Sequence, residues 1–211
     1  MKLLIATTNP GKLREMREVL TPLGFEVVSL ESASRALPEP VEDAATFAGN
    51  ARIKADAYAR ARGLTCVAED SGIEVDALDG APGVHSARYA GSAGVREERD
   101  RANNAKLLSA LAQRGPVARD ARFVCAICVA DAAGQVLFET RATCEGVIAP
   151  ELRGEGGFGY DPLLLVPELG LTMAQLSPEQ KNARSHRGQA TRALAAWLAT
   201  YARQQAGTPR S

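Results

Sequence analysis

Two acidic side chains, Glu69 and Asp70, stand next to each other at the end of a short apolar segment. The Ser-Gly pair at 71–72 follows them, and we expect it to form a turn between a strand over 64–68 and another over 73–78. Ligands of α/β sheets bind at the carboxyl ends of strands, and a turn would let both carboxylates reach one metal ion. Taken alone, these residues are more typical of a solvated turn with an Asp cap.

A junction between strand and helix carries the sequence TTNPGK at 7–12. Backbone N–H groups at a helix N-terminus, two small hydroxyls and Lys12 together suit an anion such as phosphate. The segment is not a Walker A loop, because that motif requires Gly at the position of Ala6 and a hydroxyl at the position of Leu13. An ordinary turn with Asn9 as the helix N-cap explains the same residues.

A third cluster leads into a helix that we expect over 46–62. Phe47, Asn50 and Lys54 follow i, i+3, i+7 spacing and share one face of that helix. An amide and an ammonium group on this face are unlike a plain core stripe. Glu42 stands just before the helix, where a negative charge also interacts favourably with the helix dipole, so its position has a purely structural explanation as well.

Two further segments complete this inventory. The first, GGFGYDP at 156–162, offers aromatic rings on which a base can stack, although a turn with packed aromatics fits it at least as well. The second, KNARSHRG at 181–188, supplies Lys181, His186 and Arg187 as donors to phosphate or to a keto oxygen. A polyphosphate bound to Mg²⁺ and carrying a stacked base would use all of these groups.

The elements that must position these residues follow from periodicity and from turn residues. Strands alternate with helices early in the chain and a long hairpin follows across 131–134, which predicts an α/β fold with a mixed sheet. The expected strands are 2–6, 26–30, 64–68, 73–78, 121–130, 135–148 and 163–166, and the expected helices are 13–23, 46–62, 97–113 and 177–205. Ser177 and Ser185 are both plausible N-caps and can divide the last helix in two. We expect an acidic loop over 32–45 and a flexible tail over 204–211.

Composition excludes several classes of protein. The 211 residues carry 25 Lys and Arg against 25 Asp and Glu, and this zero net charge argues against a dedicated nucleic-acid binder. No apolar run approaches the about 20 residues that cross a bilayer, and the apolar start is too short for a signal peptide, so we expect a cytoplasmic protein with no membrane partner. With only 2 histidines, any metal would need carboxylate ligands, which favours Mg²⁺ or Mn²⁺.

Cys125 and Cys128 have the CxxC spacing of redox and metal sites. They lie in a segment with the pattern of a strand, where side chains three positions apart point to opposite faces, so the two thiolates do not share a metal there. We therefore expect them, with Cys66 and Cys144, to be buried structural thiols.

Five blocks occur in order between Lys2 and Trp197: TTNPGK, TFAGNARIKA, AEDSGIEVDALDGAPGVHSARYAG, FGYDP and KNARSHRGQA. In these blocks the chain closely resembles the inosine/xanthosine triphosphate pyrophosphatase family. The resemblance implies a single domain over 1–203, with an elongated two-lobed α/β fold, a central mixed sheet flanked by helices and an active-site cleft between the lobes. It also implies a homodimeric, Mg²⁺-dependent enzyme, for which Mn²⁺ is an expected substitute because it accepts the same oxygen ligands. Such an enzyme hydrolyses ITP, dITP and XTP to the monophosphate and pyrophosphate and removes them from the nucleotide pool.

The resemblance also assigns roles to individual residues. Asp70 would be the proton acceptor and a metal ligand, with Glu42 and Glu69 as further acidic ligands. The sequence departs from many relatives at two positions: they have Asp in place of Glu69, and often Gly in place of Thr8. The residues that would line the substrate site are Thr7, Thr8, Asn9, Lys12, Lys54 and Ser71. The base-recognising loop and the residues that complete it would be Phe158, Gly159, Tyr160, Asp161, Lys181, His186 and Arg187.

Base selectivity has a simple expected origin in hydrogen bonding. A donor to the keto oxygen at purine position 6 would be left unpaired against the amino group of adenine, at a cost of about 1–3 kcal/mol. His186, Arg187 or a nearby backbone N–H are the candidate donors. Guanine carries the same keto oxygen, so this donor does not distinguish it.

Two alternatives stay open at this stage. A non-catalytic sensor of purine triphosphates would bind without turnover, although pure anion binding would avoid the carboxylates of Glu42, Glu69 and Asp70. A related pyrophosphatase of the septum-associated (Maf) type would act on a different modified nucleotide, although the FGYDP and SHRGQA blocks favour the purine family.

Overall fold

The computed structural model describes residues 2–30 and 37–206, and this part of the chain contains a seven-stranded sheet flanked by helices. The strand order is β2-β1-β3-β4-β5-β6-β7, with β1 parallel to β2 and β3, and β6 antiparallel to β5 and β7. The predicted α/β fold with a mixed sheet is confirmed. The strands are β1 (Lys2–Ala6), β2 (Glu26–Ser29), β3 (Cys66–Val75), β4 (Asp120–Ala130), β5 (Val136–Ile148), β6 (Leu164–Val166) and β7 (Leu171–Thr172). The α-helices are α1 (Pro10–Leu20), α2 (Phe47–Arg62), α3 (Arg96–Gln113), α4 (Pro178–Arg184) and α5 (His186–Ala206).

The chain divides into two compact units. Unit 1 consists of Met1–Asp70, Ala126–Arg141 and Ala190–Ser211, and unit 2 consists of Ser71–Cys125 and Ala142–Gln189. The strands β3, β4 and β5 contribute residues to both units. In β3 the boundary falls between Asp70 and Ser71, two consecutive residues of the expected site.

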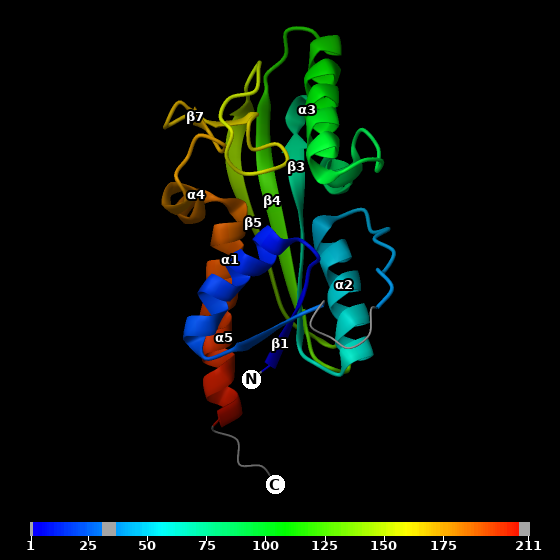
Figure 1. The fold of residues 1–211 in the computed structure, drawn as a ribbon, viewed down its shortest axis with the longest axis vertical. Helices are drawn as coiled ribbons and strands as arrows, with labels where there is room; N and C mark the ends of the chain where they lie inside the picture. Colours follow the sequence, from blue (N-terminus) through cyan, green and yellow to red (C-terminus); the bar gives the residue numbers. More distant parts are fainter. Residues whose placement is uncertain (1, 31–36, 207–211) are drawn as a thin grey trace. The chain divides into compact units, whose positions relative to one another are not determined.

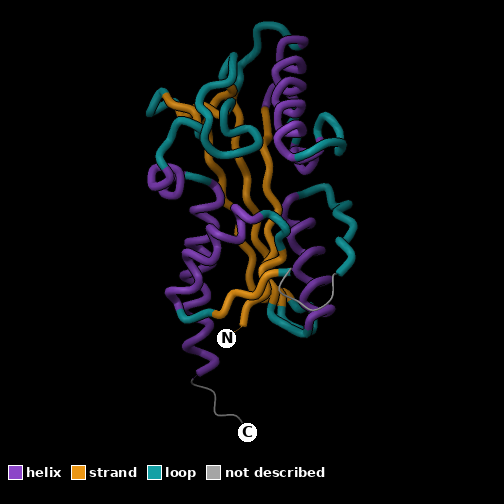
Figure 2. Tube along the Cα trace, viewed as in Figure 1, coloured by secondary structure: helices purple, strands orange, loops and turns teal. Residues whose placement is uncertain are grey.

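Two crossovers in unit 1 place helices on opposite faces of the parallel strands. β1 connects through α1 to β2, and β2 connects through α2 to β3. Because β2 and β3 flank β1 on opposite sides and such crossovers are right-handed, α1 and α2 cover opposite faces. Figures 1 and 2 show α1 and α5 on one side of these strands and α2 on the other.

The helices of unit 1 begin and end close to the predicted residues. The side chains of Asn9 and Thr46 accept backbone N–H bonds at the first turns of α1 and α2 respectively, as N-caps do. A 3-10 turn, η1 (Thr21–Leu23), prolongs α1 to Gly24 at φ 82°, and α2 ends at Gly63 with φ 61°. Both glycines adopt the left-handed conformation that ends helices at little cost.

Unit 2 has a hydrophobic core of its own. Leu107 and Leu111 of α3 are almost fully buried against Ile73 of β3 and against Leu163 and Leu164 at the start of β6. The i, i+4 spacing of the two α3 leucines places them on one apolar stripe of this helix. β4 and β5 are neighbours in the sheet, and the turn that joins them lies at the predicted position.

The predicted C-terminal helix is two helices. Ser177 begins α4 with a capping box that includes Gln180. Ser185 follows α4, and its hydroxyl accepts the N–H of Gly188 at the start of α5. Since α5 continues to Ala206, residues 204–206 of the expected tail are helical, and 207–211 lie outside the described residues.

The predicted turn at 71–72 is wrong, because β3 continues through it as one strand. Gly72 serves close packing instead of a turn: a Cβ there would overlap the side chain of Ser86 and lie 2.9 Å from the carbonyl oxygen of Gly83. Residues 76–78, predicted as the end of a strand, form a 3-10 turn, η2 (Asp76–Leu78). Of the expected acidic loop, 37–45 are described and contain neither helix nor strand, and 32–36 lie outside the described residues.

This packing leads to the first prediction. Gly72→Ala is expected to lower the free energy of unfolding by about 1–3 kcal/mol, because the added methyl group forces apart β3 and the segment around Ser86. Gly11→Ala is the matched control, since its methyl group would meet only Asn9 Oδ1, at 3.3 Å. Chemical denaturation of both variants measures the difference, and equal stabilities would show that the strand tolerates a side chain at position 72.

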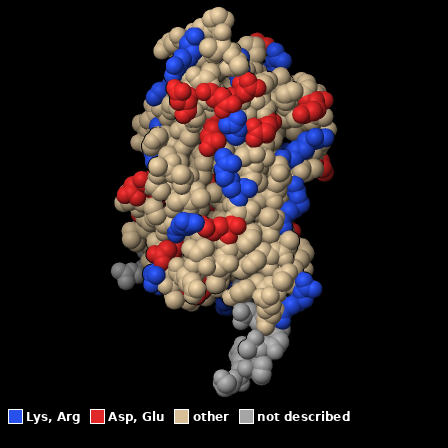
Figure 3. Space-filling view, turned by 180° about the vertical axis from the view of Figure 1, so that it is seen from behind, with Lys and Arg blue, Asp and Glu red and all other residues tan. Residues whose placement is uncertain are grey.

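Charged side chains of both signs are interspersed on the face of the molecule in Figure 3. This distribution agrees with the zero net charge of the chain. Within the described residues, no helix is long and apolar enough to cross a membrane.

Candidate active site

A cluster of charged side chains in unit 1 surrounds the amino group of Lys54 on α2. Its Nζ lies 2.8 Å from Glu42 Oε2 and 3.4 Å from Asp70 Oδ1. The other carboxylate oxygen of Asp70 accepts a 3.1 Å hydrogen bond from the side-chain amide of Asn50. The structure therefore brings two predicted carboxylates to one cation, and both oxygens of Asp70 have partners that orient them.

Asn50 explains why a polar residue occupies the buried face of α2. Its side chain is 1% exposed, and its amide oxygen accepts the N–H of Ala44 at 3.0 Å while its amide nitrogen donates to Asp70. The residue thus ties the segment that carries Glu42 to the strand that carries Asp70. The helical spacing predicted that Asn50 shares a face with Lys54, but it did not predict the hydrogen-bond partners of Asn50.

Glu69 belongs to a different contact. Its carboxylate lies 2.7 Å from the ammonium group of Lys12 on α1, and its side chain is 2% exposed. Consecutive side chains of a strand point to opposite faces, so Glu69 is directed to the α1 face and Asp70 to the α2 face. A buried ion pair of this kind keeps the ammonium group of Lys12 in a fixed place.

The expected three-carboxylate metal site is not assembled in the part of the chain that the structure describes. No group of three or more His, Cys, Asp and Glu residues lies close enough there to hold a metal ion. The physical reason is the continuity of β3 through residues 71–72, which separates Glu69 from Asp70. Glu42 and Asp70 remain the pair of carboxylates that share one cation.

The TTNPGK segment forms the start of α1. The side chain of Asn9 accepts the N–H of Gly11 at 3.0 Å and that of Lys12 at 3.4 Å, and Thr7 Oγ1 accepts the N–H of Asn9 at 3.1 Å. The interpretation of Asn9 as the N-cap of α1 is therefore confirmed. The N–H groups of Gly11 and Lys12, which were expected to face an anion, donate to the side chain of Asn9 instead. Thr7 is half-buried and Thr8 is exposed.

In unit 2, the glycine-rich loop is held by a carboxylate from its own sequence. Asp161 Oδ2 accepts the N–H of Phe158 at 2.8 Å and lies 2.6 Å from the ammonium group of Lys181. A Cβ on Gly157 would lie 2.7 Å from that ammonium nitrogen and on top of the carboxylate, so only glycine admits the pair this close to the backbone. Gly157 also has φ 79°, which favours glycine for a second reason.

Three cationic groups surround the ring of Phe158. The guanidinium of Arg96 lies 4.4 Å from the ring centroid, and Lys181 Nζ and the guanidinium of Arg187 each lie 5.4 Å from it. Such contacts are attractive because the face of an aromatic ring carries partial negative charge. The predicted residues Phe158, Lys181 and Arg187 thus lie together in unit 2, and Arg96 is a member of the group that the sequence did not reveal.

Three predicted residues of unit 2, Tyr160, His186 and Arg187, are buried. Tyr160 donates a 2.9 Å hydrogen bond from its phenol to the carbonyl oxygen of Ser86, and burial raises the pKa of this phenol well above its usual value, so it stays protonated. Arg187 Nη2 donates to Ser71 Oγ at 3.2 Å. The ring of His186 stacks on Phe123 at 4.9 Å, which places the imidazole in the core of the unit.

All four cysteines are buried, as predicted. Burial raises the pKa of Cys128 to about 12 and that of Cys66 further still, which keeps both as thiols. Since the thiolate is the reactive form, the native protein is expected to resist alkylation by iodoacetamide at pH 8, whereas the protein in urea reacts fully. Mass spectrometry counts the labelled thiols, and rapid labelling of Cys125 or Cys128 in the native protein would favour a reactive CxxC motif instead.

An α/β fold with a lysine on α2 between carboxylates of β3 and of the segment before α2, and with a glycine-rich aromatic loop, is typical of proteins that bind nucleotides. The comparison with known families makes the assignment specific. The model of the Ham1 family matches residues 3–197, and the chain belongs to this family. The resemblance inferred from the five sequence blocks is thereby confirmed.

Individual relatives cover nearly the whole chain. A dITP/XTP pyrophosphatase of an Exiguobacterium species is 53% identical over 196 residues, 93% of this chain and 96% of that protein. A dITP/XTP pyrophosphatase of Thermus thermophilus is 48% identical over 195 residues, 92% of this chain and 90% of that protein. The solved structure of a HAM1 protein from Coxiella burnetii matches with a TM-score of 0.87 and 38% identity, covering 94% of this chain and 98% of that one.

Proposed function

We propose that this protein is a nucleoside triphosphate pyrophosphatase that hydrolyses dITP, XTP and ITP to the monophosphate and pyrophosphate. Membership of the Ham1 family, and relatives of 48% and 53% identity that are named dITP/XTP pyrophosphatase, support the proposal. The observation that carries it is the convergence of the Glu42 and Asp70 carboxylates on Lys54. Hydrolysis of these purine nucleotides removes them from the pool from which DNA and RNA are made.

The two carboxylates suit a divalent cation. One ammonium nitrogen lies within reach of both Glu42 and Asp70, so their oxygens already converge on a single cation position. Mg²⁺ is commonly held by one or two carboxylates together with substrate phosphates and water, and Mn²⁺ accepts the same oxygen ligands. When bound, such an ion supplies charge neutralisation at the phosphates and a more acidic water. In this proposal Glu69 holds Lys12 and does not complete the ligand set.

The reaction requires charge compensation and a proton acceptor. Lys54 and Lys12 contact the negatively charged phosphates, and the hydroxyls of Thr7, Thr8 and Ser71 donate further hydrogen bonds. A water oxygen forms a bond to the α-phosphorus while the bridging bond to the β-phosphate breaks. The proton of that water passes to the Asp70 carboxylate, which Asn50 and Lys54 keep in one orientation, and pyrophosphate leaves.

The loop over 158–161 is proposed to bind the purine base. The ring of Phe158 offers a stacking surface, and the side chain of Asp161 fixes the backbone of the loop. Arg187 and backbone N–H groups are the preferred donors to the keto oxygen at purine position 6, because the imidazole of His186 is stacked on Phe123. His186 then acts by supporting its neighbour Arg187 at the start of α5.

A sensor that binds purine triphosphates without turnover is the alternative. Incubation with XTP and Mg²⁺, followed by ³¹P NMR, separates the two functions. The proposed enzyme yields XMP and pyrophosphate in equal amounts, a triphosphatase yields XDP and phosphate, and a sensor leaves XTP intact. Either of the last two results contradicts the proposal.

The oligomeric state and the compartment are part of the same proposal. We propose a cytoplasmic homodimer, for which stacked and half-exposed rings in unit 1 offer a contact: Trp197 lies 5.0 Å from Phe138 and 4.8 Å from Tyr201. Light scattering after size exclusion measures the mass, and a value near the 22.3 kDa of one chain would contradict a dimer.

A further inference from the structure

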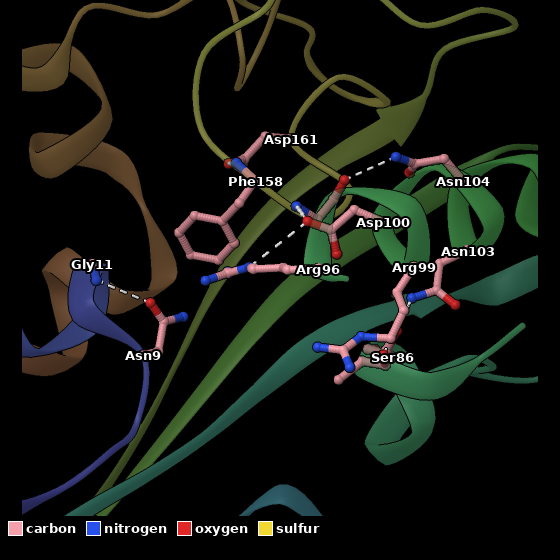
Figure 4. Close-up of polar contacts among 12 residues, drawn as sticks. Asn9, Gly11, Ser86, Arg96, Arg99, Asp100, Asn103, Asn104, Phe158 and Asp161 are labelled. Atoms are coloured by element: carbon pink, nitrogen blue, oxygen red, sulfur yellow. Dashed lines mark hydrogen bonds and ion pairs between the residues drawn. The ribbon is translucent and has the colours of Figure 1, made fainter. Parts of the chain in front are cut away.

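The glycine-rich loop is tied to α3 by contacts that no sequence block indicated. Gly159 donates its N–H to Asp100 Oδ2 at 2.8 Å, and its carbonyl oxygen accepts a 2.9 Å hydrogen bond from the side-chain amide of Asn104. One peptide segment of the loop is therefore held from both sides by two residues of one helix. Figure 4 shows Asp100 and Asn104 directed from α3 toward this loop.

Arg96 continues the same stripe on α3. Arg96, Asp100 and Asn104 follow i, i+4, i+8 spacing and so share one face of the helix. The guanidinium of Arg96 lies over the ring of Phe158, and its Nε lies 3.9 Å from Asp100 Oδ2. Successive turns of α3 thus contact the ring of Phe158, the N–H of Gly159 and the carbonyl oxygen of Gly159.

The loop needs external contacts of this kind. Gly156, Gly157 and Gly159 follow one another closely, and glycine loses more conformational freedom on ordering than any other residue. Gly159 has φ 62°, and a free glycine populates positive and negative φ about equally, so its own backbone does not select this conformation. A rigid helix that bonds both polar groups of Gly159 selects one of these conformations.

The burial of Asn104 indicates that its polar side chain serves the hydrogen bond to the carbonyl oxygen of Gly159. Its side chain is 4% exposed, and its amide oxygen has no hydrogen-bond partner among the described residues. An unsatisfied buried polar group destabilises the folded state, so an apolar residue would serve the core of unit 2 better. The bond to the carbonyl oxygen of Gly159 is the contact that an apolar residue cannot replace.

We propose that α3 is a positioning element for base recognition, in which Asp100 and Asn104 fix the Gly159 peptide and Arg96 fixes the ring of Phe158. The inference rests on the proposed role of the loop in binding the base. By holding the ring and the adjacent backbone groups in one orientation before substrate arrives, α3 lowers the entropy cost of binding a purine. These three are positioning residues, because they act through the loop.

Steady-state kinetics of Asp100→Ala and Asn104→Ala with dITP, XTP and ATP test this inference. Each variant is expected to raise the KM for dITP and XTP roughly tenfold, the effect of losing one hydrogen bond of 1–2 kcal/mol, with a smaller change in kcat. Discrimination against ATP, whose amino group at purine position 6 cannot accept the hydrogen bond of the keto-oxygen donor, is expected to fall as well. Inhibition by inorganic triphosphate, which has no base, is expected to stay unchanged.

Two further variants control for charge and for folding. Asp100→Asn keeps an oxygen that can accept the Gly159 N–H, so its KM is expected to lie close to the wild-type value. This variant provides the test if the alanine variant does not fold. Glu97→Ala removes an exposed carboxylate three residues away on the same helix and is expected to have wild-type kinetics.

Phe158→Ala separates a failure of this inference from a failure of the proposed base site. If Phe158→Ala loses selectivity while Asp100→Ala and Asn104→Ala keep wild-type KM values, the role of α3 is wrong and the base site stands. If Phe158→Ala also keeps its selectivity, the loop does not bind the base and the inference falls with it. Weaker inhibition by triphosphate in the α3 variants, in step with KM, would also overturn the inference, because it would indicate general damage.

Discussion

Replacing Asp70 with Asn is expected to lower kcat for dITP and XTP roughly 10²- to 10⁴-fold, the contribution that a positioned general base makes. The amide keeps the size of the side chain and can still accept a hydrogen bond from Asn50, which is 3.1 Å from the carboxylate. It cannot take the proton of the attacking water, and it is a weaker ligand for a divalent cation. Stopped assays of pyrophosphate release at saturating nucleotide and Mg²⁺ measure the loss.

Asp56→Asn is the matched control for this substitution. Asp56 lies on α2 in the same unit and pairs with Arg60 one turn away at the surface, so its loss is expected to leave kcat unchanged. Thermal unfolding should report native stability for both variants. Substantial Mg²⁺-dependent turnover by Asp70→Asn would remove Asp70 from the role of proton acceptor.

The second large effect is expected at Lys54. Lys54→Met retains most of the apolar stem of the side chain but removes the charge between Glu42 and Asp70, and we expect kcat/KM to fall roughly 10²- to 10³-fold. Both parameters should change: KM rises because a phosphate contact is lost, and kcat falls because that contact strengthens as charge develops in the transition state. Steady-state kinetics over a range of XTP concentrations resolves the two.

Lys2→Met provides the comparison for the loss of one lysine. Its ammonium group pairs with Glu26 at the surface of the same unit, 3.4 Å away, and both side chains are more than half exposed. This control is expected to have wild-type kinetics. Unchanged kinetics in Lys54→Met would place Lys54 outside the reaction and would leave its ion pairs with Glu42 and Asp70 a purely structural role.

Local rules explain why so much of the fold was predictable. Asn9, Thr46 and Ser177 are N-caps whose side chains satisfy backbone N–H groups within three residues, and such contacts depend on neighbouring sequence alone. Gly24 and Gly63 end helices for an equally local reason. The mixed sheet followed from the order of these elements along the chain.

The error at residues 71–72 arose because glycine has more than one use. Gly72 was interpreted as a turn residue, whereas it leaves room for Ser86, fourteen positions later in the chain. Nothing in the neighbouring sequence distinguishes the two uses. This error also affected the predicted site. A continuous strand directs Glu69 to Lys12, so that Glu42 and Asp70 are the carboxylates that share one cation among the described residues.

The role of Arg96, Asp100 and Asn104 on α3 was not predicted from the sequence, for a similar reason. Their spacing of four residues is visible, but polar residues at that spacing on a helix are usually solvated. Only the three-dimensional contacts of Asp100 and Asn104 with Gly159, more than fifty residues away, give the stripe a role. Contacts between distant segments are what a helical pattern cannot contain.

The most direct test of the central claim is pyrophosphate release from dITP, XTP, GTP and ATP, measured with Mg²⁺ and again with excess EDTA. We expect fast release from dITP and XTP, slow release from GTP and ATP, and none from any nucleotide once the metal is chelated. Equal rates with all four nucleotides would contradict the proposed recognition of the base. Absence of pyrophosphate with Mg²⁺ present, together with tight binding of dITP in calorimetry, would contradict the enzyme itself and favour a sensor.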